Sequence, residues 1–213
     1  MTKKPLLIAI DGPAASGKGT LAKKVAEHFD LEYLDTGKIY RALGKKILDK
    51  GFSSENKDMA VELAKTINLQ DMSQDGLYNE YIGNAASIVA AIPEVRAELL
   101  EFQRKVARSQ KGAVLDGRDI GTVVCPEADF KFYITASIEA RAERRYKQLQ
   151  EKENSIIYQD VFDDLKKRDD RDGGRKVAPL KQASDAIFID TTNITAEEVL
   201  SNILDIISAR NKQ

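Results

Sequence analysis

The sequence contains little of several residue types on which particular classes of protein depend. Its 213 residues include one cysteine, one histidine and no tryptophan. A single cysteine excludes an internal disulfide framework and suits a reducing compartment, and one cysteine with one histidine cannot build a His/Cys zinc site. Basic residues (33) and acidic residues (34) nearly balance, so the chain lacks the basic excess of a protein that binds duplex DNA. We therefore expect no nucleic-acid partner, and any recognition of phosphate must be local.

Long apolar runs are also missing. No run approaches the roughly 20 residues that a membrane-spanning helix needs, and the N-terminal segment M-T-K-K-P leads too quickly into a strand to be a signal peptide. Hydrophobic residues make up 42% of the chain and charged residues 31%, which is typical of a globular protein. Nothing indicates an obligate assembly. We expect one cytoplasmic domain over residues 1–213, a monomer without membrane contact.

A glycine-rich loop, Gly12–Thr20, dominates the N-terminal part of the chain. It follows the apolar run 6–10, which predicts a buried parallel strand, and precedes a helical pattern with apolar residues every four positions over 21–29. Glycines let successive N–H groups bind one anion, the helix N-terminus adds its positive end, and Lys18 supplies a full charge for the β- and γ-phosphates. The loop predicts a phosphate-binding site made of Gly12, Pro13, Ala14, Ala15, Ser16, Gly17, Lys18, Gly19 and Thr20, the residues that would hold ATP if the family resemblance given below applies.

The loop departs in one place from the common pattern G-x-x-x-x-G-K-[ST]. Gly19 stands directly after Lys18, where the pattern has a hydroxyl, and Thr20 follows it. The hydroxyl expected to approach Mg²⁺ is therefore one residue late, and Thr20 is the candidate metal ligand of the loop. The ending G-K-G-T resembles the nucleoside monophosphate kinases rather than the GTPases or motor ATPases.

Apolar strands and amphipathic helices alternate along the rest of the chain. Further strands are expected to end at Asp35 and to span 113–115, 130–135 and 186–189, and the capping box Thr195–Glu198 is expected to open the last helix. Such alternation predicts a parallel sheet covered by helices on both faces. We therefore expect an α/β fold, a P-loop kinase-like domain of three layers with a five-stranded parallel sheet.

The pattern is less regular between residues 52 and 92. Ser53 and Ser54 are candidate caps of a helix, and helical periodicity returns from Asn84. Between these helices, residues 68–81 hold short mixed runs around an Asp-Gly turn signal. Such runs favour a small hairpin or a loop.

Polar clusters follow the expected strands. The segments Asp35–Arg41 and Asp116–Asp119 come after the second and third strands, at the edge of a parallel sheet where ligands gather. A further cluster, K-K-R-D-D-R-D-G-G-R-K over Lys166–Lys176, allows two interpretations. By itself a mixed charge run indicates a solvated, salt-bridged helix. Beside a phosphate loop it favours a lid that closes on phosphate and excludes water.

Five segments together resemble the bacterial cytidylate kinases. They are G-P-A-A-S-G-K-G-T, L-D-T-G-x-I-Y-R, N-A-A-S-x-V-A-A-x-P-x-V-R, D-G-R-D-I-G-T-V-V and K-x-R-D-D-R-D-x-x-R-x-V-A-P-L. They occur in this order over nearly the whole chain, and the last four in combination are specific to this family. The resemblance implies transfer of the γ-phosphoryl group of ATP to CMP or dCMP, with Mg²⁺, in pyrimidine nucleotide metabolism.

The resemblance also assigns roles to residues. The catalytic residues would be Lys18, Arg118, Arg168 and Arg175. CMP would be bound by Thr36, Arg41, Arg118 and Arg175 at its phosphate, by Arg168 and Asp172 at its ribose, and by Ser87, Arg96 and Asp119 at its base. A carboxylate such as Asp119 can accept the amino group of cytosine. Asp116 is either a ligand of Mg²⁺ beside Thr20 or a carboxylate that caps a turn.

The chain departs from the family in one region. The family carries a longer nucleotide-binding insertion where this sequence has only D-M-S-Q-D-G-L-Y-N-E-Y-I-G between Leu69 and Asn84. We expect a core, a monophosphate-binding arm and a lid within the single domain. Their expected ranges are 1–51, 93–152 and 179–213 for the core, about 52–92 for the arm and about 153–178 for the lid.

Two other functions are weighed against this one. Another small-molecule P-loop kinase, acting on UMP, shikimate or a coenzyme precursor, would lack the D-G-R-D-I-G-T and R-D-D-R-D segments seen here. A non-enzymatic nucleotide-binding switch would have a hydroxyl directly after the loop lysine and a motif that specifies guanine, and this sequence has neither.

Overall fold

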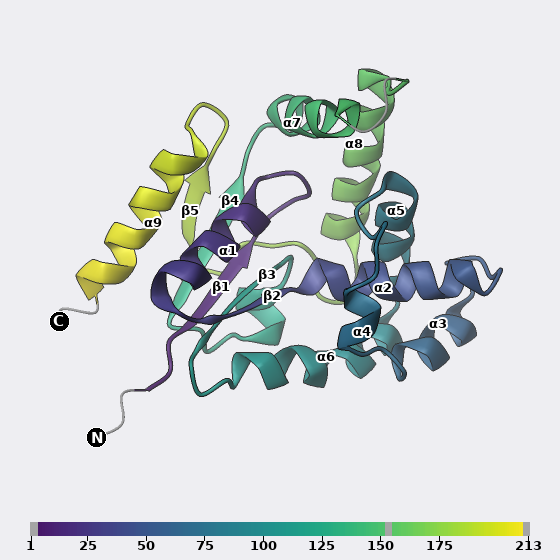
Figure 1. Ribbon diagram of the computed structural model, residues 1–213, viewed down its shortest axis with the longest axis horizontal. Coiled ribbons are helices and arrows are strands. Elements are labelled where there is room, and N and C mark those ends of the chain that lie inside the picture. The colour runs from purple at the N-terminus through teal and green to yellow at the C-terminus, as the bar shows by residue number, and fades with distance from the viewer. Residues whose placement is uncertain (1–3, 152–154, 211–213) are drawn as a thin grey trace.

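The computed structural model describes residues 4–151 and 155–210, and its centre is a five-stranded parallel sheet (Figure 1). The strands are β1 (Leu7–Asp11), β2 (Glu32–Asp35), β3 (Ala113–Gly117), β4 (Phe130–Thr135) and β5 (Ile187–Asp190). Their order across the sheet is β2-β3-β1-β4-β5, and all four pairings are parallel. The α/β fold class expected from the sequence is confirmed.

Helices connect the strands and extend the domain on one side. They are α1 (Lys18–Phe29), α2 (Thr36–Asp49), α3 (Lys57–Ala64), α4 (Leu69–Met72), α5 (Glu80–Val89), α6 (Pro93–Ala107), the π-helix η1 (Ile120–Val124), α7 (Ile138–Gln150), α8 (Tyr158–Gly174) and α9 (Ala196–Arg210). Figure 1 shows α2 leaving the sheet edge, with α3, α4 and α5 gathered around it and α8 standing above.

Different helices cover the two faces of the sheet. On one face, Ile8 and Ile10 of β1 and Phe132 of β4 pack with α1 and α9. On the other face, Ala9 of β1 and Leu115 of β3 pack in a cluster with α2, α3, α5 and α6. Alternate residues of one strand therefore serve opposite faces, which gives the three layers that the sequence predicts.

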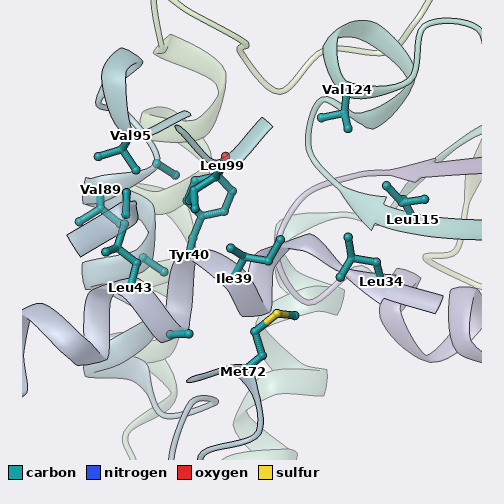
Figure 2. Packing of buried hydrophobic residues seen from close by; sticks show 14 of the residues in the cluster. Leu34, Ile39, Tyr40, Leu43, Met72, Val89, Val95, Leu99, Leu115 and Val124 are labelled. Carbon is teal, nitrogen blue, oxygen red and sulfur yellow. The ribbon is translucent and has the colours of Figure 1, made fainter. Parts of the chain in front are cut away.

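The second cluster continues from the sheet into the helices around α2. Figure 2 shows Leu34 and Leu115 of the strands at one end and Leu43 and Val89 of the helices at the other. Because the packing is continuous, the arm is attached to the sheet through a shared core and through α2, which packs against α5.

The strands end at nearly the same level on the side where the glycine-rich loop lies. Asp35 of β2 is opposite Asp116 of β3, and Asp11 of β1 is opposite Gly117 of β3. Three carboxylates therefore mark the carboxyl edge of the sheet, which is where ligands bind in open parallel sheets.

Three expectations for residues 52–92 are wrong: the cap of the first helix, the structure of residues 68–81 and the start of the helix that follows them. Asn56, and neither Ser53 nor Ser54, caps α3, because its side chain accepts the backbone N–H of Met59 at 3.1 Å. The side chain of Ser53 accepts the N–H of Glu55 instead, and so forms a turn before the helix.

The capping box Thr195–Glu198 at the start of α9 is confirmed.

Residues 68–81 form neither a hairpin nor a simple loop. Asn68 and Asp71 cap each other's backbone N–H groups around the short helix α4. The next helix, α5, begins at Glu80, because Asn79 accepts the N–H of Ile82 at 2.7 Å. It therefore starts earlier than the expected Asn84.

A candidate nucleotide-binding site

A cavity of about 720 Å³ opens at the carboxyl edge of β2 and β3. It is bounded by the glycine-rich loop, the start of α2, the arm helix α5, α6 and the lid helix α8. The cavity brings together most of the site residues expected from the sequence: Ala14, Ala15, Ser16, Gly17, Lys18, Gly19, Thr20, Thr36, Arg41, Ser87, Arg96, Asp116, Arg118, Asp119, Arg168, Asp172 and Arg175. Gly12 and Pro13, the first two residues of the loop, do not line the cavity.

The glycine-rich loop is shaped by its backbone. Gly17 precedes α1 with a φ of 84°, and Ala15 has a φ of 59°, so the chain turns back on itself before the helix begins. A Cβ atom on Gly12 would lie 1.9 Å from the carbonyl oxygen of Ile134, so only glycine allows the loop to pass this close to β4. No side chain caps α1, which leaves its first N–H groups for an anion.

Lys18 is held in the middle of this loop. Its Nζ donates to the carbonyl oxygen of Pro13 at 3.1 Å, and the side chain is buried. Burial and then the positive charge of Arg118 lower the pKa of Lys18 below the ordinary value for lysine. A bound anion would oppose both effects, because its negative charge would stabilise the protonated ammonium.

Asp116 also lines the cavity, and its negative charge acts on Lys18. Burial and then the nearby Asp35 raise the pKa of Asp116 above its usual range. Its Oδ2 accepts a hydrogen bond from the hydroxyl of Tyr33 at 3.1 Å, and that hydroxyl also lies 3.4 Å from the carbonyl oxygen of Gly19. Tyr33 therefore ties the end of β3 to the first turn of α1. Sequence analysis missed this residue, because an aromatic side chain in a short strand indicates core packing.

The residues around Asp116 bear on whether Mg²⁺ fits. Mg²⁺ keeps several waters and takes one or two carboxylates together with substrate phosphates, so a large protein cage is not needed. Among the described residues, no group of three or more His, Cys, Asp or Glu side chains could hold a metal by itself. Asp116 is a buried carboxylate beside the loop, and Ser16 Oγ is buried without a partner in the described structure. These donors fit a magnesium ion that arrives with phosphates. Thr20 is exposed at the cavity edge.

Asp172 connects helix α8 to cavity residues from other segments. Its carboxylate accepts from Ser87 Oγ of α5 at 3.1 Å and from Arg118 Nε at 2.9 Å. Its backbone carbonyl accepts from Arg175 Nε at 3.2 Å. Burial by itself would raise the pKa of Asp172, but Arg118 and Arg175 outweigh it and the pKa is lowered. Asp172 is therefore held as a carboxylate that orients residues from three segments.

Arg96 and Asp119 form a second buried pair. The guanidinium of Arg96 in α6 donates to the carboxylate of Asp119, which directly follows Arg118. Arg96 also donates to the carbonyl oxygen of Ala90 at 3.3 Å and lies over the ring of Tyr40 at 5.5 Å. A buried ion pair of this kind is costly to split, so its members stay oriented at the cavity wall.

Other arginines keep donors available. Arg168 Nε and Arg175 Nη2 are buried and have no hydrogen-bond partner among the residues that the structure describes. Burial and then the charge of Arg118 lower the pKa of Arg168. Burial and then Arg168 lower the pKa of Arg41 to about 10. These guanidinium groups lie close together and some of their N–H donors are unpaired. A bound polyanion would neutralise their charge and accept those donors.

Two expected site residues serve the backbone. Thr36 Oγ1 donates to the carbonyl oxygen of Asp116 at 2.7 Å, so its hydroxyl already joins α2 to β3. Arg41 Nη1 donates to the carbonyl oxygen of Leu77 at 2.9 Å, and its guanidinium lies 5.3 Å from the ring centre of Tyr78. Both residues line the cavity, and Arg41 also fixes the short arm that sequence analysis could not interpret.

Helix α8 packs against the glycine-rich loop and is not a solvated helix on this side. Val161 and Leu165 of α8 are buried against Ala14. Arg141 of α7 donates to the carbonyl oxygen of Ala14 at 3.2 Å and pairs with Asp169 of α8 at 2.6 Å. Sequence analysis missed α7 as a contributor, because its charges resemble those of an ordinary exposed helix.

Arg145 is the second residue of α7 that sequence analysis missed. It lines the cavity, pairs with Glu80 at the start of α5 and donates to the carbonyl oxygen of Tyr78 at 2.8 Å. Arg145 therefore connects α7 to the start of α5 and the residues before it.

In the part of the chain that the structure describes, no helix is long and apolar enough to cross a membrane.

Comparison with known proteins gives a consistent result. A family model described as cytidylate kinase matches residues 8–209. A cytidylate kinase of Methylocella silvestris is 48% identical over 96% of this chain and 94% of its own length. One of Rhodospirillum rubrum is 46% identical over 98% of this chain and 100% of its own length.

One solved structure bears on the fold alone. An uncharacterized protein from Eubacterium ventriosum, 18% identical, superposes with a TM-score of 0.55 and covers 95% of this chain and 98% of its own.

Proposed function

The chain belongs to the cytidylate kinase family, and on that premise we propose that it transfers the γ-phosphoryl group of ATP to CMP or dCMP. The products are CDP or dCDP and ADP. One observation carries the proposal: a single cavity holds an anion-binding loop on one side and, on the other, arginines from α2, α6, α8 and the segment that follows β3. Two polyanions can approach each other only where such positive groups surround both.

On the donor side, the loop binds the phosphates of ATP. The free N–H groups at the start of α1 point at the β- and γ-phosphates, and Lys18 places its ammonium against the group that moves. Phosphate raises the lowered pKa of Lys18 again and keeps this side chain protonated during transfer. Asp116, together with the hydroxyl of Ser16 or Thr20, would hold Mg²⁺, which would supply positive charge beside the phosphates.

On the acceptor side, Arg41, Arg118 and Arg175 surround the phosphate of CMP, with Thr36 at the start of α2. Arg168 and Asp172 bind the ribose. The base lies against Ser87, Arg96 and Asp119. There the Asp119 carboxylate accepts a hydrogen bond from the amino group at C4 of cytosine. Uracil has a carbonyl oxygen at that position, which a carboxylate repels.

Transfer then needs positioning and charge neutralisation. An oxygen of the acceptor phosphate forms a bond to the γ-phosphorus, the bond from that phosphorus to the bridging oxygen breaks, and ADP leaves with that oxygen. No general base is required, because the attacking phosphate is already an anion at neutral pH. The catalytic residues are Lys18, Arg118, Arg168 and Arg175, whose charges stabilise the transferred group.

The lid prevents hydrolysis of ATP. The apolar contact of Val161 and Leu165 with Ala14 excludes water above the loop. We assign the core to residues 1–51, 93–152 and 179–213, the arm to about 52–92 and the lid to about 153–178. Residue 152, at the end of one core range, and residues 153–154, at the start of the lid range, lie outside the described residues, as do residues 1–3 and 211–213.

We further place this reaction in pyrimidine nucleotide metabolism in the cytoplasm, catalysed by a monomer. The buried, unpaired thiol of Cys125 suits a reducing compartment. Both nucleotides fit within one chain's cavity, so the mechanism needs no second subunit. Light scattering behind a sizing column would test the last point, with 23.7 kDa expected for the monomer.

The direct test is a panel of acceptors. Initial rates of ADP formation are measured with ATP, Mg²⁺ and equal concentrations of CMP, dCMP, UMP, AMP and GMP. CMP and dCMP should be turned over far faster than the purine nucleotides. Equal turnover of all five acceptors would replace the proposal with a general nucleotide kinase, and ATP binding without any transfer would favour a nucleotide-binding switch.

A further inference from the structure

The short helix η1 directly follows Arg118 and Asp119, and it is a π-helix. The N–H groups of Val124 and Cys125 donate to the carbonyl oxygens of Asp119 and Ile120, five residues earlier, at 3.1 and 2.7 Å. Single π-turns are rare and are frequent at functional sites, because they turn side chains into directions that an α-helix does not allow. What holds this turn therefore decides where Asp119 points.

Asp119 is at the N-cap position of η1 but does not cap it. An aspartate at this position ordinarily accepts one of the first N–H groups of its own helix. Here the carboxylate of Asp119 is paired with Arg96 at the cavity wall. The first N–H groups of η1 need another acceptor, because buried backbone donors are almost always satisfied.

Asp11 supplies that acceptor from the end of β1. Its Oδ1 accepts the N–H of Ile120 at 2.8 Å, and its Oδ2 accepts the N–H of Gly121 at 2.8 Å. Burial raises the pKa of Asp11 to about 6 even though both hydrogen bonds favour the carboxylate. A buried charge that lacks a cationic partner at hydrogen-bond distance is expensive, so the two backbone bonds have to be retained for the turn to stay closed.

Arg104 of α6 holds the other end of the turn. Its Nε donates to the carbonyl oxygen of Val124 at 3.1 Å, and its Nη2 donates to that of Val123 at 3.2 Å. A negative group at the first N–H groups and a positive group at the last carbonyls is the arrangement that the helix dipole favours. The two side chains come from different elements, β1 and α6, and neither lines the cavity.

We propose that Asp11 is a positioning residue for recognition of the acceptor base: by capping η1 in place of Asp119, it frees the Asp119 carboxylate to face the cavity. Arg104 supports the same turn from its other end. Asp11 also directly precedes Gly12, so one residue links the ATP loop to the segment that reads the base. The inference rests on the proposed function, in which CMP is the acceptor.

Asp11→Asn tests the inference in the full chain. Asparagine replaces one of the two accepting oxygens with an NH2 group, so one of the N–H groups of Ile120 and Gly121 loses its acceptor. The Asp119 carboxylate is then drawn back toward its own helix. We expect the Kd for CMP, measured by titration calorimetry, to rise about tenfold or more, as loss of a buried charge-assisted hydrogen bond implies. The Kd for ATP should stay within about twofold, and the ratio of the KM values for CMP and UMP should move toward one.

Arg104→Lys gives an independent test far from the ATP loop. Lysine keeps the charge but cannot bind two carbonyls at once, so the Kd for CMP should rise by about threefold with the Kd for ATP unchanged. Asp129→Asn is the matched control, because Asp129 Oδ2 also accepts a backbone N–H, that of Leu7 at 2.9 Å, away from the cavity. It should lower Tm without changing either Kd.

The outcomes separate cleanly. If both variants weaken CMP and spare ATP, the inference stands. If Asp11→Asn weakens ATP as much as CMP, or lowers only Tm, while Arg104→Lys leaves CMP binding unchanged, Asp11 is structural and the inference is overturned. Should Asp11→Asn fail to fold, Arg104→Lys alone decides. If the wild-type chain does not bind CMP at all, the proposed function fails and the inference fails with it.

Discussion

The donor and acceptor sides of the cavity hold their charge in different ways. On the donor side, one contiguous loop offers backbone N–H groups and a single lysine, Lys18. On the acceptor side, side chains from α5, α6, α8 and the segment after β3 are paired with one another, mainly through Asp172 and Asp119. On the donor side, phosphate binding therefore depends on few groups. On the acceptor side, many side chains contribute positive charge and hold one another in place.

The sharpest way to break this comparison is to remove the one donor-side charge. Lys18→Ala should lower kcat by about a thousandfold, because no neighbouring side chain replaces its charge on the transferred group. Tm without ligand should not fall, since burial already disfavours the charged form of Lys18. A coupled assay for ADP measures the first effect and a melting curve the second. Lys24→Ala is the control, because Lys24 lies in the same helix but does not line the cavity. A rate near that of wild type for Lys18→Ala would refute the role.

Removal of one acceptor-side arginine should have a smaller effect. Arg175→Ala is expected to lower kcat/KM for CMP by about a hundredfold and to leave the KM for ATP nearly unchanged, because Arg118 and Arg41 remain near the phosphate. Steady-state kinetics at varied CMP and ATP gives both values. Arg171→Ala is the matched variant, because Arg171 is a half-buried neighbour that donates to Asn84 Oδ1 at 3.1 Å and does not line the cavity. If the two variants behave alike, Arg175 does not bind the acceptor.

A change at the base-reading carboxylate should alter selectivity more than rate. Asp119→Asn keeps the volume of the side chain but adds a donor that uracil can accept, so the preference for CMP over UMP should narrow by about tenfold. Competition between the two nucleotides in one reaction measures this ratio. Asp185→Asn, whose ion pair with Lys131 lies outside the cavity, should keep the ratio of wild type. An unaltered ratio in Asp119→Asn would remove this residue from base recognition.

The smallest expected effect is on stability. Burial and then Asp35 raise the pKa of Asp116 above its ordinary 3.8, so its contribution to stability is present below that value and is lost as pH rises through the folded pKa. Without ligand at pH 8, Asp116→Asn should therefore raise Tm, by about 2–4 °C for each 1 kcal/mol in a chain of this size. The gain should shrink at pH 5, and activity with Mg²⁺ should fall.

The opposite sign would be informative. A lower Tm for Asp116→Asn at pH 8 would mean that the charged carboxylate stabilises the ligand-free fold through Lys18 and Tyr33. Asp116 would then be a structural residue, which is the second of the two interpretations that the sequence leaves open.

The same comparison explains what could be predicted from the sequence. The donor loop is local, so its glycines, its lysine and the flanking strand and helix are visible in one short stretch. Thr195–Glu198 is visible for the same reason. Asp11 and Tyr33 could not be found, because their roles consist of hydrogen bonds to residues 109 and 83 positions away. Nothing in a strand-ending aspartate indicates which distant N–H groups it will accept.

The arm shows a second limit. Asn56, Asn68 and Asn79 each cap a helix there, and Ser53 competes as a cap in the sequence. Which of several polar residues becomes the cap depends on how Leu77 and Met72 are buried against α2, and that is a tertiary effect. The acceptor-side arginines could be named only through resemblance to a family, since charge runs by themselves also describe solvated helices.

The central claim is that the donor and acceptor sites face each other within one cavity. A bisubstrate analogue, adenosine and cytidine joined through a chain of five phosphates, tests it directly by thermal shift and titration calorimetry with Mg²⁺. We expect the analogue to bind more tightly than ATP or CMP, to raise Tm beyond the shift given by either, and to exclude both. Binding no tighter than ATP alone, with CMP still able to bind beside the analogue, would contradict the claim.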